Sequence, residues 1–421
     1  MPGSGRLAVL REPDYRRLFL GRTTSLVGDG MAPIAIAFAV LDLTGSATDL
    51  GLVLTAHAVV MIALLLVGGV VGDRVSPRLA MLGADATRAI STALLAALLL
   101  TGAAEIWQLA LLYAIDGAAT AFFNPASSAI VPQVVSGRRL QESNALLNIS
   151  RHGGKVVGPA LAGVLLALGS PGTALAVNAA TFAVSAFCLL GVHAPKAPHA
   201  DGEPAFFSEL RHGWREFSSR RWMVAIVLSA AVGNGIFFPV FQVLGPVVSN
   251  ESLDGSSSWA LIMALFGAGG LLGAVAALSL RPRRPLLVGE GLICLIAIPA
   301  LLLAVPVSTA AIALGALVSA ATVGFGEVLY DTVVAQQVPA ESLSRVIAYD
   351  WFGALALEPV GLALVGPMAA GLGTSTTLYL GAAAITVCQA CVLLVPGVRR
   401  LEFRPDATGP VPPLRPVEAG D

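Results

Sequence analysis

Long stretches without a charged residue are the feature that most limits how this chain can fold. The segments Gly51 to Val71 and Ser91 to Leu100 contain no Asp, Glu, Lys or Arg, and Ile34 to Leu41 is equally apolar. A helix that crosses about 30 Å of hydrocarbon needs such a stretch. Hydrophobic residues make up 56% and charged residues 12% of the 421 positions, whereas an average soluble domain carries about 25% charged residues. The sequence therefore predicts an all-α, polytopic membrane protein.

Charge and motif content exclude several functions. The formal net charge of -1 gives no bulk attraction to nucleic acid. A GxxxxGK[ST] loop is absent, which excludes direct coupling to ATP in this chain. An HExxH motif and a nucleophile paired with a base near the midplane are absent too, so the sequence does not predict an enzyme.

The four cysteines lie inside apolar runs, where neither a disulfide framework nor a zinc cluster has a plausible setting. Cys388 and Cys391 form a CxxC spacing, but on a membrane helix this spacing only places two side chains on one face. We therefore expect no metal site and no cofactor.

Apolar runs between charged or Gly/Pro/Ser breaks predict twelve membrane spans. All Lys and Arg residues between spans fall in alternate connections, and the six intervening loops contain none. Because cytoplasmic loops are rich in Lys and Arg, we expect both termini to lie on the cytoplasmic side of the inner membrane. The predicted spans are 18–42, 48–71, 79–101, 106–127, 143–168, 172–192, 222–248, 258–280, 285–304, 307–331, 343–369 and 374–396.

The spans fall into two groups of six. We expect a cytoplasmic tail at 1–17, a six-helix bundle at 18–192, a cytoplasmic linker at 193–221, a second bundle at 222–396 and a disordered cytoplasmic tail at 397–421. The linker ends in a sequence typical of a short amphipathic helix, which would turn Leu210, Trp214 and Phe217 toward lipid headgroups. An ordinary tether is an equally acceptable interpretation.

An internal repeat relates the two bundles. A shift of 205 residues lays Gly28-Asp29-Gly30 onto Gly233-Asn234-Gly235, and a shift of 203 lays Gly158 onto Gly361 and Lys155 onto Glu358. Segments that agree on nearly one shift describe a six-plus-six repeat. Repeats of this kind place the binding site near the bilayer midplane, between the halves.

The connection after the second span reads Gly69-Val-Val-Gly-Asp73-Arg74-Val-Ser-Pro-Arg78. It resembles the signature loop between helices 2 and 3 of the major facilitator superfamily, although Ser76-Pro77 stands where a glycine and a basic residue are usual. The resemblance implies a gating loop in which Asp73 lies at the N-terminal end of helix 11, where the helix dipole favours an anion. Arg74 and Arg78 would then engage nearby carboxylates or lipid phosphate.

The fifth span carries a second pattern of that superfamily. Because proline removes a backbone donor and glycines allow a neighbouring helix to approach closely, we expect a bent, closely packed helix that acts as a pivot. Glu358-Pro359 predicts a related bend in helix 11. The pattern resembles the antiporter motif of the superfamily's exporters, with Ala162 in place of the first glycine of the usual closing pair, and its residues are Gly154, Gly158, Pro159 and Gly163.

Further segments resemble the enterobactin-exporter and macrolide-efflux branch of the superfamily. The resemblance covers the whole chain and implies secondary active export of a small molecule, such as a drug, a siderophore or a natural product, by alternating access. The segments that carry it are Asp14-Tyr-Arg-Arg17-Leu-Phe, the pair Asp85 and Arg88, Phe123-Asn-Pro125, Val131-Pro132 and Asn144-Ala145.

Ionisable groups deep in predicted spans are functional candidates, because they are costly to place in lipid. Asp29, Asp116 and Glu358 are the candidate proton carriers, and we expect Arg151 and Lys155 to balance the acids as a midplane charge cluster. Asp29 is the first choice, because flanking glycines leave it accessible and its repeat mate Asn234 cannot titrate. A static salt-bridge network remains the alternative.

Other polar residues receive structural or cavity roles. Arg22, Asp85 and Arg88 lie near predicted span ends, where long side chains reach the interface, and we expect them to be structural. His57 and His152 are either proton relays or packed side chains. In the superfamily's architecture, helices 1, 4, 7 and 10 line the cavity, which implies a substrate cavity with an apolar or aromatic ligand; its candidate residues are Asn234, Glu327, Phe237, Phe238 and Trp351.

The sequence thus predicts a proton-coupled exporter whose partners are a small-molecule substrate, protons and the lipid bilayer, acting as a monomer. A proton-linked importer or uniporter of a metabolite is the nearer alternative. A membrane sensor that transports nothing is a third, and the midplane acids count against it.

Overall fold

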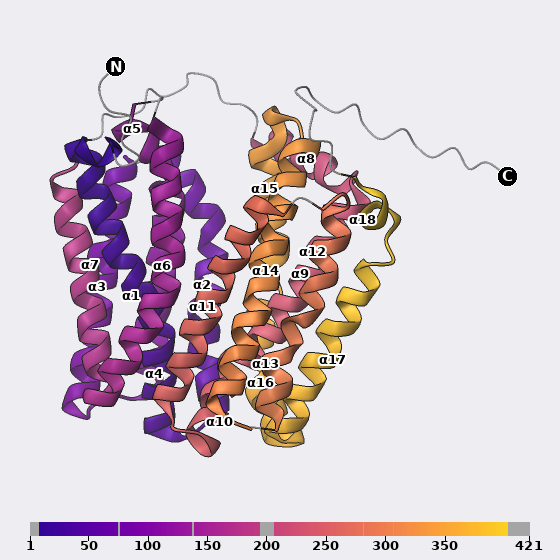
Figure 1. The fold of residues 1–421 in the computed structure, drawn as a ribbon. Helices are drawn as coiled ribbons and strands as arrows, with labels where there is room; N and C mark the ends of the chain where they lie inside the picture. Colours follow the sequence, from indigo (N-terminus) through magenta and orange to yellow (C-terminus); the bar gives the residue numbers. More distant parts are fainter. Residues whose placement is uncertain are drawn as a thin grey trace.

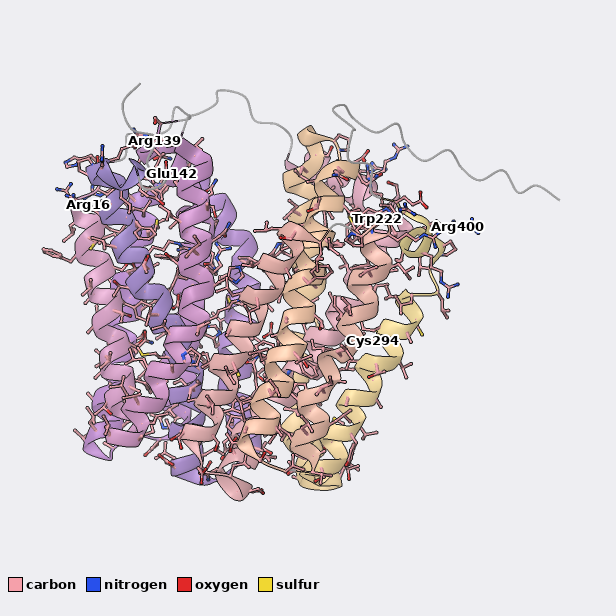
Figure 2. All side chains as sticks on the ribbon, in the orientation of Figure 1. Arg16, Arg139, Glu142, Trp222, Cys294 and Arg400 are labelled. Carbon is pink, nitrogen blue, oxygen red and sulfur yellow. The ribbon has the colours of Figure 1, made fainter. Side chains whose placement is uncertain are left out.

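The structure is a computed structural model that describes residues 8–74, 76–136, 139–193, 206–280, 282–305 and 307–402. These residues form helices and short connections (Figure 1). Arg16, Arg139 and Arg400 lie at the same end of the helices (Figure 2). We name this end the arginine-rich end and the other the arginine-free end.

The N half consists of six long helices and one short one. Tight turns at the arginine-free end join several of them, and Gly45 (φ 67°) and Gly102 (φ 70°) end their helices in the left-handed region that glycine adopts without strain. The elements are η1 (Ala8–Arg11), α1 (Pro13–Thr44), α2 (Ala47–Arg74), α3 (Pro77–Thr101), α4 (Ile106–Ala129), α5 (Val131–Val134), α6 (Leu140–Leu168) and α7 (Pro171–Leu190).

The C half repeats this plan with interrupted helices. Its seventh span contains two π-helical segments, its ninth contains a 3₁₀ segment, and its eleventh is broken at residues 356–357, directly before Glu358-Pro359. The elements are α8 (Phe206–Ser218), α9 (Arg221–Val232), η3 (Gly233–Phe237), η4 (Val240–Leu244), α10 (Gly245–Ser252), α11 (Ser256–Ser279), α12 (Pro285–Ile293), η5 (Cys294–Ala297), α13 (Ile298–Ala304), α14 (Thr309–Gln337), α15 (Ala340–Leu355), α16 (Glu358–Leu372), α17 (Thr374–Val392) and α18 (Pro396–Arg400).

The predicted architecture of twelve spans in two bundles is confirmed. Eleven helices of the described chain are long and apolar enough to cross a membrane, and the twelfth span is α6, whose 29 residues include the polar segment around Arg151 and Lys155. The break before Glu358-Pro359 follows from the missing proline N–H. By contrast, α6 continues through Pro159 as one helix.

Glycines form the closest contacts inside each half, in matching places. A Cβ built at Gly158 would lie 2.6 Å from the Gly30 Cα, and one built at Gly361 would lie 1.8 Å from the Gly235 carbonyl oxygen. The first pair joins α6 to α1 and the second joins α16 to η3. Because a side chain at these positions has no room, the glycines set the closest approach of the crossing helices.

The two halves meet along a seam toward the arginine-free end. A Cβ at Gly51 of α2 would lie 2.5 Å from the Leu362 carbonyl oxygen of α16, and one at Gly366 would lie 2.4 Å from the Thr48 Cα. On the other side, a Cβ at Gly163 of α6 would lie 2.5 Å from the Ala260 Cβ of α11. Toward the arginine-rich end the ribbons of the halves diverge (Figure 1).

Helix α8 packs on the C half. The Phe217 side chain is 4% exposed and stacks on Tyr349 of α15 with ring centroids 6.2 Å apart, while Trp214 is exposed and meets the edge of the same ring. The expectation that Phe217 faces lipid headgroups is therefore wrong, because this side chain fills the groove between α8 and α15. Leu210 lies outside the side chains that the structure describes.

Candidate functional site

A cluster of charged side chains fills the centre of the N half. Arg88 of α3 donates one hydrogen bond from Nη2 to Asp29 Oδ1 of α1 and another from Nε to Asp116 Oδ1 of α4, the latter over 3.0 Å. The Arg88 side chain is 5% exposed. One guanidinium therefore holds two carboxylates from two different helices, in a setting where an unpaired charge would be very costly.

A histidine extends this cluster on a fourth helix. His57 Nε2 of α2 lies 3.4 Å from Asp116 Oδ2, and the imidazole stacks on Tyr113 with centroids 4.3 Å apart. On the other side, the Arg88 guanidinium lies 3.9 Å from the centre of the Phe182 ring. We call Asp29, His57, Arg88 and Asp116 the N-half ion cluster.

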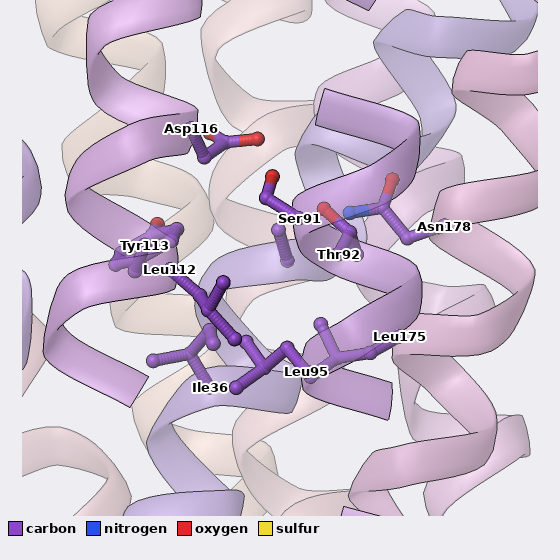
Figure 3. A pocket seen from close by; sticks show the side chains of 10 residues that line it. Ile36, Ser91, Thr92, Leu95, Leu112, Tyr113, Asp116, Leu175 and Asn178 are labelled. Atoms are coloured by element: carbon purple, nitrogen blue, oxygen red, sulfur yellow. The ribbon is translucent and has the colours of Figure 1, made fainter. Parts of the chain in front are cut away.

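A small pocket adjoins Asp116 (Figure 3). Its volume of about 10 Å³ is close to the space that one water molecule needs. Ser91 and Thr92 of α3 and Asn178 of α7 supply polar atoms to its wall. The pocket therefore offers a polar position for one water beside the buried end of the cluster.

The glycines on either side of Asp29 allow its side chain to reach the N-half ion cluster. A Cβ at Gly28 would lie 2.2 Å from the Asn178 Oδ1, and one at Gly30 would lie 2.4 Å from the Gly154 carbonyl oxygen of α6. The glycines therefore bring α1 against α6 and α7. The Asp29 side chain is 35% exposed, against 10% for Asp116, so Asp29 is the more accessible carboxylate.

The expected partners of the two acids were wrong. Arg151 and Lys155 are exposed on α6, whereas Arg88, which we expected near a span end, makes both ion pairs. Helix α3 runs from Pro77 to Thr101, so Arg88 lies near the middle of its helix, as Asp29 does in α1. Asp85, on the same helix, is fully buried as well. The position of Arg88 near the middle of a membrane-spanning helix was the sequence signal that could have identified it as the partner of the two acids.

Glu358 approaches the cluster from the other half. It occupies the first turn of α16, which packs against α2 across the seam, and it lies within electrostatic range of His57. The acid is half-buried. An acid of the C half therefore lies near the His57 end of the N-half ion cluster.

At the position that corresponds to Asp29 in the internal repeat, the C half carries neutral groups. Asn234 of η3 donates from Nδ2 to the Ala354 carbonyl oxygen over 3.0 Å, directly before the break in the eleventh span. Phe237 is fully buried and stacks on Phe241 at 5.7 Å, so it belongs to the packed interior. Phe238 is half-buried and Trp351 is 61% exposed.

A buried acid of the C half was given no role by the sequence reasoning. Glu290 of α12 is 5% exposed and accepts a hydrogen bond from Gln389 Nε2 of α17 over 3.0 Å. Gln389 in turn bonds Ser229 of α9. Cys294, one turn further along, lies at mid-depth of the C half (Figure 2). Within the described chain, Glu290 has no ion-pair partner, unlike Asp29 and Asp116 of the N half.

The gating loop is described in part. Helix α2 runs through Gly69 to Arg74 and α3 begins at Pro77, while the side chains of Asp73 and Arg74 lie outside those that the structure describes. Arg78 donates from Nε to the Leu189 carbonyl oxygen over 2.9 Å and from Nη2 to that of Leu190 over 2.7 Å. It therefore binds the C-terminal end of α7, and no carboxylate partner of Arg78 occurs in the described chain.

No group of three or more His, Cys, Asp or Glu side chains that could hold a metal ion occurs in the described chain. The cysteines are free thiols there. Cys388 lies near Ser229, with 3.6 Å between Sγ and Oγ, and Cys391 is exposed.

Twelve spans in two related bundles, with ionisable groups buried between helices, define a polytopic membrane transporter. The family model of the Major Facilitator Superfamily matches residues 18–357. The chain belongs to this superfamily, and it is a transporter, not an enzyme.

Several known proteins are similar along most of the chain. The multidrug efflux pump Tap of Mycolicibacterium fortuitum is 26% identical over 90% of this chain and 95% of its own length. Macrolide efflux protein A of Streptococcus pyogenes is 24% identical over 61% of this chain and 64% of its own length.

Solved structures show the same fold. A mutant of the nucleoside transporter NupG superposes with a TM-score of 0.76 at 12% identity, over 90% of this chain and all of that one. A bacterial homologue of the human lysosomal transporter Spinster, in an inward-facing and unoccupied conformation, superposes with a TM-score of 0.73 at 15% identity, over 94% of this chain and 98% of that one.

Proposed function

We propose that the chain is a proton-coupled exporter of drug-like small molecules that works by alternating access. The efflux pumps named above are similar over most of their length, which favours export over import. The N-half ion cluster supports coupling to protons, because it holds two carboxylates on one arginine.

The proposed orientation places the arginine-rich end in the cytoplasm, since cytoplasmic loops retain Lys and Arg. In that orientation the halves separate toward the cytoplasm and touch toward the outside, which suits the loading of an exporter. Reporter fusions at Thr44, Gly102, Asp254 and Gly371 should give an external signal. Fusions at Ser136, His199 and Pro282 should give a cytoplasmic one, and one clear reversal would refute the orientation.

The proposed organisation follows the sequence boundaries. The bundles comprise 18–192 and 222–396, joined by a linker at 193–221 and flanked by cytoplasmic tails at 1–17 and 397–421. A single chain contains both halves of the cavity, so the monomer is the proposed working unit. Cross-linking in membranes at low expression should then leave the chain monomeric.

Asp29 is the proposed proton-carrying group. Protonation of Asp29 removes its ion pair with Arg88, while Asp116 and His57 keep the guanidinium in place. Helix α1 is then released from α3. Because α1 also packs on α6, and on α10 and α11 across the seam, a proton on Asp29 changes how firmly the N half is held at the point where the halves rock.

Transport in proteoliposomes tests this role. Asp29→Asn should abolish substrate-driven proton movement while retaining substrate binding, since the amide keeps the shape but not the charge. Glu358→Gln should have the smaller effect, because Glu358 only approaches the cluster from outside. Active transport against a gradient by Asp29→Asn at the parent rate would refute the assignment and make Asp116 or Glu358 the leading candidate.

A further inference from the structure

Two helices of opposite halves carry pairs of opposite charge. Helix α6 of the N half carries Arg151 and Lys155, and α14 of the C half carries Glu327 and Asp331. Each pair is separated by four residues, so its two side chains lie one above the other on one helix face. All four residues are exposed.

The two pairs come within electrostatic range of each other at one point. Glu327 lies within electrostatic range of Lys155 and of Asp331. Although accessible to solvent, Glu327 and Asp331 are crowded enough by protein atoms to be desolvated. Ionisable groups in membrane helices are tolerated where they face protein or water and not lipid.

The pairs also lie at neighbouring depths. Helix α6 starts at the arginine-rich end and α14 ends there, so the two helices run in opposite directions. Arg151 therefore lies one turn nearer that end than Lys155, and Asp331 lies one turn nearer it than Glu327. Counted from that end, Arg151 lies 11 residues after Leu140 and Glu327 lies 10 residues before Gln337, so these two residues lie at similar depth. We call the α6 pair the basic wall and the α14 pair the acidic wall.

Neither wall is neutralised in this structure. Within the described chain, none of the four side chains makes an ion pair, and their hydrogen-bonding groups have no described partner. Charges that lie inside a membrane protein without partners are costly. A ligand that supplied both missing charges would remove that cost on both sides.

We propose that these walls form a two-sided binding site for a small zwitterion, whose cationic amine meets Glu327 and Asp331 and whose anionic group meets Arg151 and Lys155. The proposal rests on the proposed transport function and names its substrate class. A purely cationic molecule satisfies the acidic wall and leaves the basic wall unpaired. The site therefore selects by the joint presence of two charges.

Equilibrium binding to the purified full chain in nanodiscs, without a proton gradient, tests the proposal. The probes are two zwitterionic scaffolds, a fluorescent fluoroquinolone and an aminopenicillin, each beside its methyl ester and its N-acyl derivative. The parent should bind each zwitterion about tenfold or more tighter than either derivative, as expected for a lost charge-assisted contact. Absence of that preference on both scaffolds overturns the proposal.

Variants assign each charge to its wall. Lys155→Gln should erase the preference over the ester while keeping the preference over the N-acyl derivative, and Glu327→Gln should do the reverse. Asp254→Asn, in an exposed loop at the arginine-free end, is the matched control and should keep both preferences. The exchange Lys155→Glu with Glu327→Lys keeps both charges and should restore a zwitterion preference if a single variant is too unstable to measure.

Other outcomes separate this site from its alternatives. The variants could keep the parent's affinity ratios between each zwitterion and its derivatives, yet change the distance between the halves in the absence of ligand. In that case the charged pairs are contacts that close the two halves together, and the binding site is refuted. Asp29→Asn should retain the zwitterion preference. A parent protein that prefers zwitterions but does not couple transport to protons would contradict the proposed function alone. A parent protein that couples transport to protons but does not prefer zwitterions would contradict the proposed site alone.

Discussion

At matching positions of the first and seventh spans, the N half has Asp29 and the C half has Asn234, and the two side chains have different partners. Asp29 binds Arg88 in a cluster of charged groups from four helices. Asn234 binds the Ala354 carbonyl oxygen beside a helix break. The glycine contacts behind them, Gly30 with Gly158 and Gly235 with Gly361, are the same.

This comparison separates what the fold requires from what the chemistry requires. The glycine contacts occur in both halves, so they belong to the fold. The N-half ion cluster has no counterpart at the matching place of the C half, so we propose that it belongs to the function. The C half instead has the interrupted helices, with π-helical segments η3 and η4 beside Asn234. Such segments are frequent at functional sites.

The largest effect should come from Arg88. Arg88→Leu leaves two carboxylates in the N half without their cation, which should destabilise the protein by about 3–5 kcal/mol. The midpoint of thermal unfolding, followed by fluorescence-detected size-exclusion chromatography, measures the loss. Adding Asp29→Asn and Asp116→Asn to Arg88→Leu should recover most of it, and failure to recover would show that packing of Arg88 on Phe182 matters more than its charge.

Substituting alanine for the glycines that both halves share should destabilise the protein less than Arg88→Leu does. The loss should be similar for the N half and the C half. Gly158→Ala and Gly361→Ala each place a methyl group against backbone, which typically costs about 1–3 kcal/mol. Gly153→Ala on α6 is the control, because a Cβ there meets nothing within 4 Å, and it should be neutral or slightly stabilising. A clear loss in only one half would break the equivalence of the two contacts.

Asn234→Leu should have a smaller effect. It removes one hydrogen bond to a carbonyl oxygen beside a helix break, for which a loss of about 1–2 kcal/mol is expected. The same thermal assay checks it, with Asn234→Asp as a comparison that keeps the shape but loses the donor. An effect as large as that of Arg88→Leu would mean that the polar centres of the halves are equally important.

The smallest effect should come from Glu290→Gln. Glu290 is buried but is held by Gln389 without a cation, and glutamine retains an oxygen that accepts from the Gln389 amide. We expect a change below about 1 kcal/mol, against a larger change for Asp116→Asn, whose charge has two partners. Equal effects would contradict the view that only the N half depends on charge.

The sequence predicted the span count, the repeat and the break in the eleventh span, because apolar length, alternate arginines and Pro359 are local signals. It did not predict that Arg88 joins Asp29 and Asp116, since three helices must be packed before that contact exists. The π-helical segments were likewise not predicted, as Gly233–Phe237 has no local signature that distinguishes it from an α-helix. Phe217 was assigned to lipid because its partner Tyr349 lies over a hundred residues away in the chain.

The seam between the halves has a consequence for how fast the transporter can switch. It is made where Gly51, Gly163 and Gly366 meet backbone or a small side chain, and the ion pairs described above each join residues of one half. Parting the halves there breaks mainly short-range dispersion contacts, since none of these ion pairs crosses the seam. We therefore expect a low activation barrier to opening at the arginine-free end, with turnover limited by events elsewhere, such as release of the bound molecule.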